Sequence, residues 1–239
     1  MISLDRRIVS GILPALVLVG ALLSGCATTE SKVDPLEPFN RTMYKVHTTI
    51  DDAIIKPVAQ GYVKVTPAPV RTSVANFFGN IDDLFSGIND VLQGNGNRAG
   101  DAFGRVLLNT TFGIAGIFDL ASMMGINKDP NDFGLTFGKW GAPQGPYLFV
   151  PLFGPTTVRD GSGWLVRLYT GPANYINDIG VRNSLYGLGY LNARAQALDA
   201  ESVLDAASLD RYLYLRNAYL RARRYQLYEG KPPPDADDQ

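Results

Sequence analysis

Residues 70–91 read VRTSVANFFGNIDDLFSGINDV, and their apolar side chains recur at alternating spacings of four and three: Val70, Val74, Phe77, Ile81, Leu84, Ile88 and Val91. This spacing places all of them on one face of an α-helix. Pro67 and Pro69 mark a turn before the stretch, and Gly94-Asn95-Gly96 marks its end. A helix this amphipathic must bury its apolar face against a partner.

Similar spacings predict helices on both sides of this stretch. Before it, apolar side chains recur every three or four residues at Phe39, Met43, Val46, Ile50 and Ile54. Pro57 is expected to end or kink that helix. After it, we expect helices over 157–169, 183–204 and 209–228. No convincing run of alternating strand residues is found, so the sequence indicates an all-α fold.

Two segments are more apolar than an ordinary amphipathic helix. Between residues 103 and 124, only Arg105 and Asp119 are charged, which predicts two short apolar helices separated by a polar break at 109–111. Residues 140–158 carry no charge and contain four prolines, which exclude a membrane-spanning helix. This second segment either packs in the core or touches lipid or a membrane protein. Its candidates for facing a membrane are Trp140, Tyr147, Phe149 and Phe153.

The N-terminal residues follow the pattern of a lipoprotein signal. Arg6 and Arg7 precede an apolar run, which ends in Leu23-Ser24-Gly25-Cys26. Because Cys26 is the only cysteine of the sequence and stands where lipidation needs it, we favour a lipid-anchored chain over an ordinary signal peptide. Each buried lipid methylene contributes about 0.8 kcal/mol, so several acyl chains on Cys26 would hold the protein at a membrane. Ala27 favours the outer membrane, by resemblance to other lipoproteins.

These features predict four parts of the chain. They are a lipoprotein signal peptide over 1–25, a lipidated tether over 26–33, one helical domain over 34–228 and a disordered tail over 229–239. The tail is rich in proline and aspartate, a composition typical of disorder.

Composition excludes several classes of function. Net charge is −1, which gives nucleic-acid binding no electrostatic support. With one histidine, His47, and one lipidated cysteine, neither a His/Cys metal site nor a cysteine nucleophile is expected. Gly161-Ser162-Gly163 lacks the first glycine of a nucleophile elbow. The carboxylate pairs Asp51-Asp52 and Asp82-Asp83 fall on polar helix faces and are expected to be solvated. No enzymatic activity, cofactor or metal is therefore predicted.

Several motifs together resemble one known family. The predicted domain opens with Asp34-Pro35-Leu36-Glu37 and Phe39-Asn40-Arg41. In chain order there follow Asn109-Thr110 with Asp119, Asp132-Phe133-Gly134, Gly145-Pro146-Tyr147, Arg159-Asp160, Arg194-Ala195, Asp210, Tyr212, Arg216, Tyr219 and Arg223. Over about residues 34–228, these resemble the MlaA (VacJ) family of outer-membrane phospholipid-transport lipoproteins.

The resemblance implies both a fold and a function. The fold would be a ring of amphipathic and short apolar helices, which lies in the membrane plane around a polar channel. The protein would remove mislocalised phospholipid from the outer leaflet of the outer membrane. It would sit beside porin trimers and pass the lipid to a soluble periplasmic carrier, MlaC, and so indirectly to an inner-membrane ATP-driven complex. No bond is made or broken in such a passage, so no catalytic residue is needed.

The candidate channel or family-motif residues are polar or aromatic: Phe39, Asn40, Arg41, Asn109, Thr110, Asp119, Arg159 and Asp160. For Arg159 and Asp160, a helix-start cap with a surface ion pair is an equal alternative. A large apolar residue at Asn109 or Asp160 is expected to impair transport without preventing folding. Two rival functions are a structural lipoprotein that only braces porins and a lipid-modifying enzyme; the second is disfavoured because no nucleophile–base pair is found.

Overall fold

The structure is a computed structural model that describes residues 34–207 and 209–233. The predicted signal peptide, the tether with Cys26 and residues 234–239 of the predicted tail lie outside the described residues. The described chain is mostly helical, in the order α2 (Glu37–Ile50), η1 (Asp51–Ile55), α3 (Lys56–Val65), α4 (Ala68–Leu92), α5 (Gly96–Thr111), α6 (Leu120–Met123), α7 (Phe133–Lys139), β1 (Tyr147–Val150), β2 (Gly154–Thr157), α8 (Val158–Thr170), η2 (Pro172–Tyr175), α9 (Ile179–Ala207) and α10 (Arg211–Leu227).

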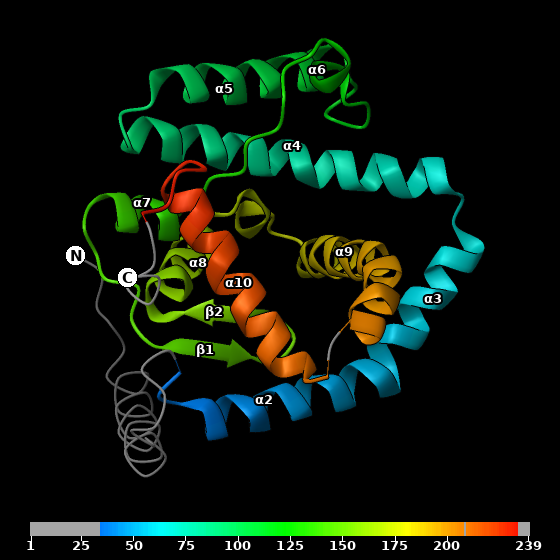
Figure 1. The fold of residues 1–239 in the computed structure, drawn as a ribbon. Coiled ribbons are helices and arrows are strands. Elements are labelled where there is room, and N and C mark those ends of the chain that lie inside the picture. Colours follow the sequence, from blue (N-terminus) through cyan, green and yellow to red (C-terminus); the bar gives the residue numbers. More distant parts are fainter. Residues whose placement is uncertain (1–33, 208, 234–239) are drawn as a thin grey trace, which may run out of the picture.

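The elements form a ring, which Figure 1 shows face on. In this view α2 and α4 lie on opposite sides, and α3 joins them. The β-hairpin, α7 and α8 close the ring on the remaining side. The helix α9 packs against α3 and α4 at the inner side of the ring, and α10 crosses the face from α7 toward α2. The all-α prediction is confirmed.

The ring turns its first corner where the first predicted helix is kinked. Pro57 has no N–H group to donate to the carbonyl of Ala53. The backbone adopts a π-helical turn here, in which the N–H of Lys56 donates to the carbonyl of Asp51 five residues back. Helix α3 continues directly from this turn, with Pro57 in its first turn. Of the two expected effects of Pro57, the kink is therefore the one found.

The apolar stretch from 103 to 124 differs from its prediction. Helix α5 runs through the expected polar break without interruption, because Asn109 and Thr110 bond to neighbouring elements and leave the helix ladder intact. After Phe112 the chain makes a tight turn, with positive φ at Ile114 and Ala115. Only the four residues of α6 follow. Helices α4 and α5 are sequential neighbours that pack together along the outer side of the ring.

The segment over 140–158 contains a β-hairpin that the sequence analysis did not predict. Strands β1 and β2 pair antiparallel, with Tyr147 opposite Thr157 and Val150 opposite Gly154. Each strand has four residues, so the alternation of buried and exposed side chains in β1 is too short to stand out in the sequence. Tyr147 and Phe149 point into a small core with Tyr212 of α10.

The remaining helix predictions are confirmed within a few residues, since α4, α8, α9 and α10 cover the expected ranges. In the described chain, no helix has both the length and the apolar character that a membrane crossing requires. Of the predicted disordered tail, residues 229–233 are described. Glu229 forms an ion pair with Lys139 of α7 at 2.8 Å.

Candidate functional site

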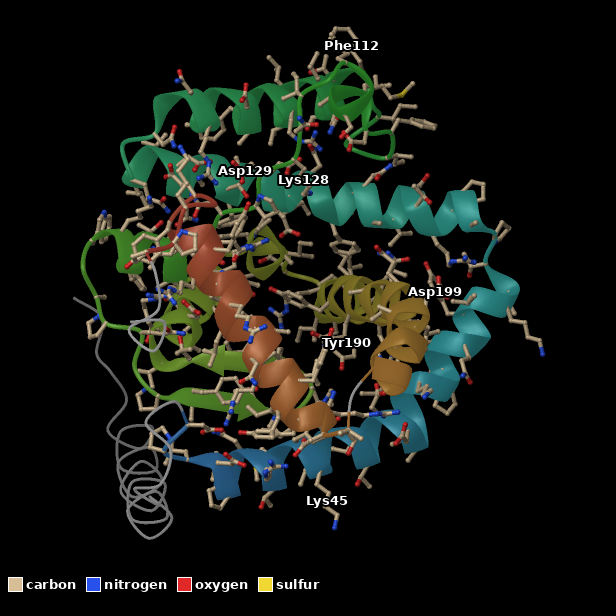
Figure 2. All side chains as sticks on the ribbon, viewed as in Figure 1. Lys45, Phe112, Lys128, Asp129, Tyr190 and Asp199 are labelled. Carbon is tan, nitrogen blue, oxygen red and sulfur yellow. The ribbon has the colours of Figure 1, made fainter. Side chains whose placement is uncertain are left out.

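An open cavity of about 920 Å³ lies between α4, the turn of the hairpin, α8, η2 and α9. This volume is near the upper end of the roughly 300–1,000 Å³ of typical small-molecule sites. Tyr190, labelled in Figure 2, is among the α9 side chains that line it. The cavity therefore joins parts of the chain that are far apart in sequence.

The walls of the cavity are mainly aromatic and aliphatic. Phe77 and Phe78 of α4 pack edge to face, with their ring centroids 5.2 Å apart. On the opposite wall, Phe153 of the hairpin turn packs on Trp164 of α8 at 4.5 Å between centroids. Gly189 of α9 lets the backbone approach closely, because a Cβ there would lie 3.1 Å from the ring of Phe78. Such a surface is suited to hydrocarbon chains.

Two opposite charges lie among the described residues that line this cavity. Arg167 of α8 donates from Nη2 to Oδ1 of Asp82 on α4 at 3.1 Å. The guanidinium carbon of Arg167 also lies 3.7 Å from the ring centroid of Phe85. The cavity thus combines apolar walls with one ion pair, the arrangement that an amphiphile requires.

Asn109 and Asp119 belong to a separate buried network between α4, α5 and α6. Arg105, only 2% exposed, donates to Asp83 at 2.9 Å and to both oxygens of Asp119 at 3.0 and 3.1 Å. The Asn109 amide donates to Asp119 at 3.0 Å and accepts from the backbone N–H of Ala121 at 2.9 Å. These contacts fix the sharp turn after α5.

The electrostatics of Asp119 reflect this network. Burial raises its pKa, but hydrogen bonds from Ser122, Asn109 and Arg105 outweigh that effect and lower the pKa to about 2. Thr110 lies in the same region and accepts a hydrogen bond from the amide of Asn80 at 2.9 Å. None of the three predicted residues in this region is among the described residues that line the cavity.

Arg159 and Asp160 lie in the first turn of α8, but not at the surface. Asp160 accepts hydrogen bonds from Arg223 at 2.9 and 3.0 Å, from Tyr219 at 2.7 Å and from Arg159 at 3.1 Å. Burial raises the pKa of Asp160, but Arg223, Tyr219 and Arg159 together outweigh that effect and lower the pKa. The helix cap is Thr157, whose hydroxyl accepts from the Asp160 N–H. The surface-pair alternative is therefore wrong, and the structure gives these residues the role of joining α8 to α10.

Asn40 joins α2 to the hairpin. Its amide donates to the carbonyl of Tyr147 at 3.0 Å and accepts from the N–H of Phe149 at 2.9 Å, so it satisfies the free edge of β1. It also donates to Asp34 at 2.9 Å.

Arg41 and Phe39 are its neighbours on α2. Arg41 pairs with Glu37 at 2.7 Å and with Asp210 at 2.9 Å, and its guanidinium carbon lies 4.7 Å from the ring centroid of Tyr212. Phe39 is half-buried. The motif thus fastens the start of the domain to α10. A channel-lining role for the eight candidate residues stays a prediction.

The comparison with known families decides the family of this chain. Residues 32–226 match the family model described as MlaA lipoprotein. The chain belongs to the MlaA lipoprotein family.

Known relatives of this MlaA family member cover most of its length. It is 33% identical to the intermembrane phospholipid transport system lipoprotein MlaA of Escherichia coli (strain K12), over 93% of this chain and 91% of the relative. The protein of the same name from Haemophilus influenzae is 32% identical over 90% of each chain. A chain of the solved structure described as "Structural basis for maintenance of bacterial outer membrane lipid asymmetry" is similar with a TM-score of 0.71 and 32% identity, over 81% of this chain and 98% of that one.

The four aromatic candidates of this MlaA protein for facing a membrane divide into two pairs. Tyr147 is 1% and Phe149 is 2% exposed, so their assignment as membrane-facing is wrong. Both side chains point to the inner face of β1, where they pack in the core. Trp140 and Phe153 are 60% and 62% exposed, and they remain candidates. The Trp140 indole donates to the carbonyl of Leu92 at 3.1 Å.

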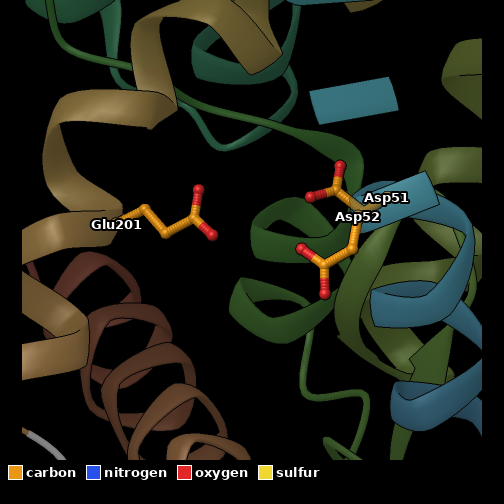
Figure 3. Close-up of side chains that lie close together, drawn as sticks. All are labelled: Asp51, Asp52 and Glu201. Atoms are coloured by element: carbon orange, nitrogen blue, oxygen red, sulfur yellow. The ribbon is translucent and has the colours of Figure 1, made fainter. Parts of the chain in front are cut away.

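Of the first carboxylate pair that was expected to be solvated, Asp51 is buried and the side chain of Asp52 is 65% exposed. Figure 3 shows Asp51, Asp52 and Glu201 near one another, where their oxygens could approach a metal ion. Cationic side chains already hold this cluster, because Arg194 binds Asp51 at 2.6 Å and Glu201 at 2.8 Å, and Lys56 binds Glu201 at 2.8 Å. The cluster is therefore an ion-pair network that joins η1 and α3 to α9.

Of the site residues predicted from the sequence, Phe153 alone is among the described residues that line the cavity. Asp82 was grouped with Asp83 as solvated; in the structure Asp83 is buried, and the side chain of Asp82 is 63% exposed and pairs with Arg167. A signal was present in Phe77 and Phe78, since adjacent large apolar residues on one helix cannot both face the same partner.

Proposed function

We propose that this protein is an outer-membrane lipoprotein that removes mislocalised phospholipid from the outer leaflet of the outer membrane. It passes the lipid to a periplasmic carrier and so maintains the lipid asymmetry of the membrane. Relatives over nearly the whole chain carry the name intermembrane phospholipid transport system lipoprotein. The observation that carries the proposal is the open cavity with apolar walls and an ion pair.

The surface of the ring supports a site within a membrane. The turn after α5 and the end of α6 expose several large apolar side chains, at 69% for Phe112, 82% for Met123 and 67% for Met124. Figure 2 labels Phe112 at the outer edge of the molecule. Several large exposed apolar side chains so close in the chain are typical of surfaces that contact lipid or another protein. With Cys26 lipidated, the ring would lie in the membrane plane, with its body on the periplasmic side and in the inner leaflet.

The mechanism is passive passage. A phospholipid head group would cross along the polar groups of the ring while its acyl chains remain against apolar walls, so that neither part is transferred into an unfavourable medium. The direction of transport would come from the affinity of the carrier MlaC and from an inner-membrane ATP-driven complex. Porin trimers would hold the ring beside them in the outer membrane.

Surface phospholipid is the quantity that tests this function. Intact cells with and without the gene would be labelled with an amine-reactive reagent that cannot cross the outer membrane, and labelled phosphatidylethanolamine would be quantified. We expect deletion to raise the labelling, and the intact gene, but not a Cys26→Ala variant, to reverse it. Unchanged labelling in an otherwise intact envelope would contradict lipid removal and favour a protein that only braces porins.

A further inference from the structure

We propose that the Asp82–Arg167 pair is the head-group site of the cavity and that it selects zwitterionic phospholipid over anionic phospholipid. The phosphate would bind Arg167, and the ammonium of a head group such as ethanolamine would bind Asp82. This inference rests on the proposed function and specifies which lipids the cavity accepts.

Arg167 has the chemistry and the fixed position that a phosphate requires. A guanidinium presents a planar fork of N–H donors that matches phosphate oxygens. This one is held between the ring of Phe85, at 3.7 Å, and the carboxylate of Asp82, at 3.1 Å. Because it is already ordered, little side-chain entropy is lost when it binds a ligand. Apart from Arg167 and Asp82, the described residues that line the cavity are apolar or aromatic, so none of them is a second cation that would compete for the phosphate.

Asp82 supplies the second half of the site. Its side chain is 63% exposed, so a ligand ammonium can reach it from the open side of the cavity. An ion pair this exposed contributes little to stability, and its exchange for two new ion pairs is therefore inexpensive. When a zwitterionic head group binds, Arg167 exchanges the carboxylate of Asp82 for the phosphate. Asp82 exchanges the guanidinium of Arg167 for the ammonium. No charge is left without a partner.

Anionic phospholipid fits the same site less well. Its phosphate would also take Arg167 from Asp82, but its head group has no cation to give to the carboxylate. Asp82 would then remain beside the phosphate, and like charges at this separation repel. Asp82 thus disfavours the binding of anionic phospholipid, whereas Arg167 binds the phosphate of any phospholipid.

The test measures which lipids the full chain binds. Purified protein would be equilibrated with an equimolar mixture of phosphatidylethanolamine and phosphatidylglycerol in detergent, re-isolated, and its bound lipids quantified by mass spectrometry. We expect the wild-type protein to be enriched in phosphatidylethanolamine. Asp82→Asn should lower the ethanolamine-to-glycerol ratio roughly five- to tenfold, the effect of about one charge-assisted contact. Asp82→Lys should favour phosphatidylglycerol, and Arg167→Gln should reduce both lipids.

Asp101→Asn is the matched control, because Asp101 is an exposed carboxylate on α5 away from the cavity. Its lipid ratio should equal that of wild type, and circular dichroism melting would show that all variants are folded. If Asp82→Asn and Asp82→Lys bind lipid in the wild-type ratio, head-group selection by this pair is wrong while transport stands. If the wild-type protein binds neither lipid and gene deletion leaves surface labelling unchanged, the proposed function itself fails.

Discussion

Asp119 is a single side chain whose charge stabilises the turn after α5. Its pKa is lowered from 3.8 to about 2, so its contribution to the free energy of unfolding is complete above pH 3.8 and is lost as the pH falls toward 2. The difference corresponds to about 2 kcal/mol. We expect Asp119→Asn to lose about this much stability at pH 7 and to approach wild type at pH 2, as measured by denaturant unfolding between pH 7 and 2. Asp101→Asn should parallel wild type throughout, and an equal pH dependence of the Asp119 variant would contradict the assignment.

The structure changes the prediction for a substitution at Asp160. A large apolar residue there was expected to leave folding intact, but Asp160 is 7% exposed and balances buried Arg159 and Arg223, whose side chain is 11% exposed. Removal of one partner from a buried ion pair costs about 3–5 kcal/mol. We therefore expect Asp160→Leu to lower the melting temperature sharply or to abolish folded protein, whereas Asp101→Leu melts as wild type. A normally melting Asp160→Leu protein that fails in transport would restore the channel-lining interpretation.

The sequence indicated several residues that are buried in the structure, but it did not reveal what they contact. Asn40 and Asp160 were singled out by family resemblance, and both are buried and fully engaged. Their partners are Tyr147, 107 positions away, and Arg223, 63 positions away. Local spacing predicts which face of a helix is apolar, but it carries no information on such distant pairs.

At the scale of elements, α7 and α8 cross at two glycines. A Cβ on Gly163 would lie 2.3 Å from the backbone nitrogen of Gly134, which is closer than any real contact. A Cβ on Gly161, in the same helix, would be 3.6 Å from Thr156. We expect Gly163→Ala to separate the two helices and to destabilise the protein by several kcal/mol, on the order of other overpacked core sites. Gly161→Ala should be neutral or more stable by about 0.5–1 kcal/mol, because alanine favours helix.

Thermal melting of the two variants gives a direct comparison, since they make the same chemical change in one helix. Equal melting temperatures would contradict the close crossing of α7 and α8.

The crossing also explains why the boundaries of the helices were easier to predict than the way in which they pack. The range of α8 follows from its apolar spacing and Thr157, but glycine at 163 reads in sequence only as a weak helix position.

The elements that were mispredicted share one physical cause. In α5, polar residues at 109–111 suggested a break, yet the side chains of Asn109 and Thr110 bond outside the helix and leave its backbone ladder intact. In the hairpin, strands of four residues interrupted by Pro155 resemble a loop, yet Asn40 and the core under Tyr147 stabilise them. In both cases tertiary contacts override the local pattern.

At the scale of the whole molecule, the cavity is a property of the ring and of no single segment. Its ion pair joins residues 85 positions apart, and its walls come from α4, the hairpin turn, α8 and α9. The walls from α4 and α8 are the ordinary apolar faces of amphipathic helices, which in sequence look like core faces. Only closure of the ring leaves these faces opposite one another with space between them.

The outer edge of the ring carries the last prediction, because the proposed function requires lipid contact there. With Cys26→Ala the chain has no cysteine, so a single cysteine at Phe112 can carry an environment-sensitive fluorophore. Phe112 is 69% exposed in the apolar turn after α5, whereas Lys45 is an exposed cation on α2, and Figure 2 shows them on opposite sides of the ring. When phospholipid vesicles are added, we expect the emission of the Phe112→Cys conjugate to shift to the blue and that of the Lys45→Cys conjugate to shift much less. Transfer of an apolar side chain out of water is favourable by about 1.5–3 kcal/mol. Transfer of a cation into hydrocarbon is unfavourable. Equal shifts would mean that the apolar turn is not the part of the ring that enters lipid.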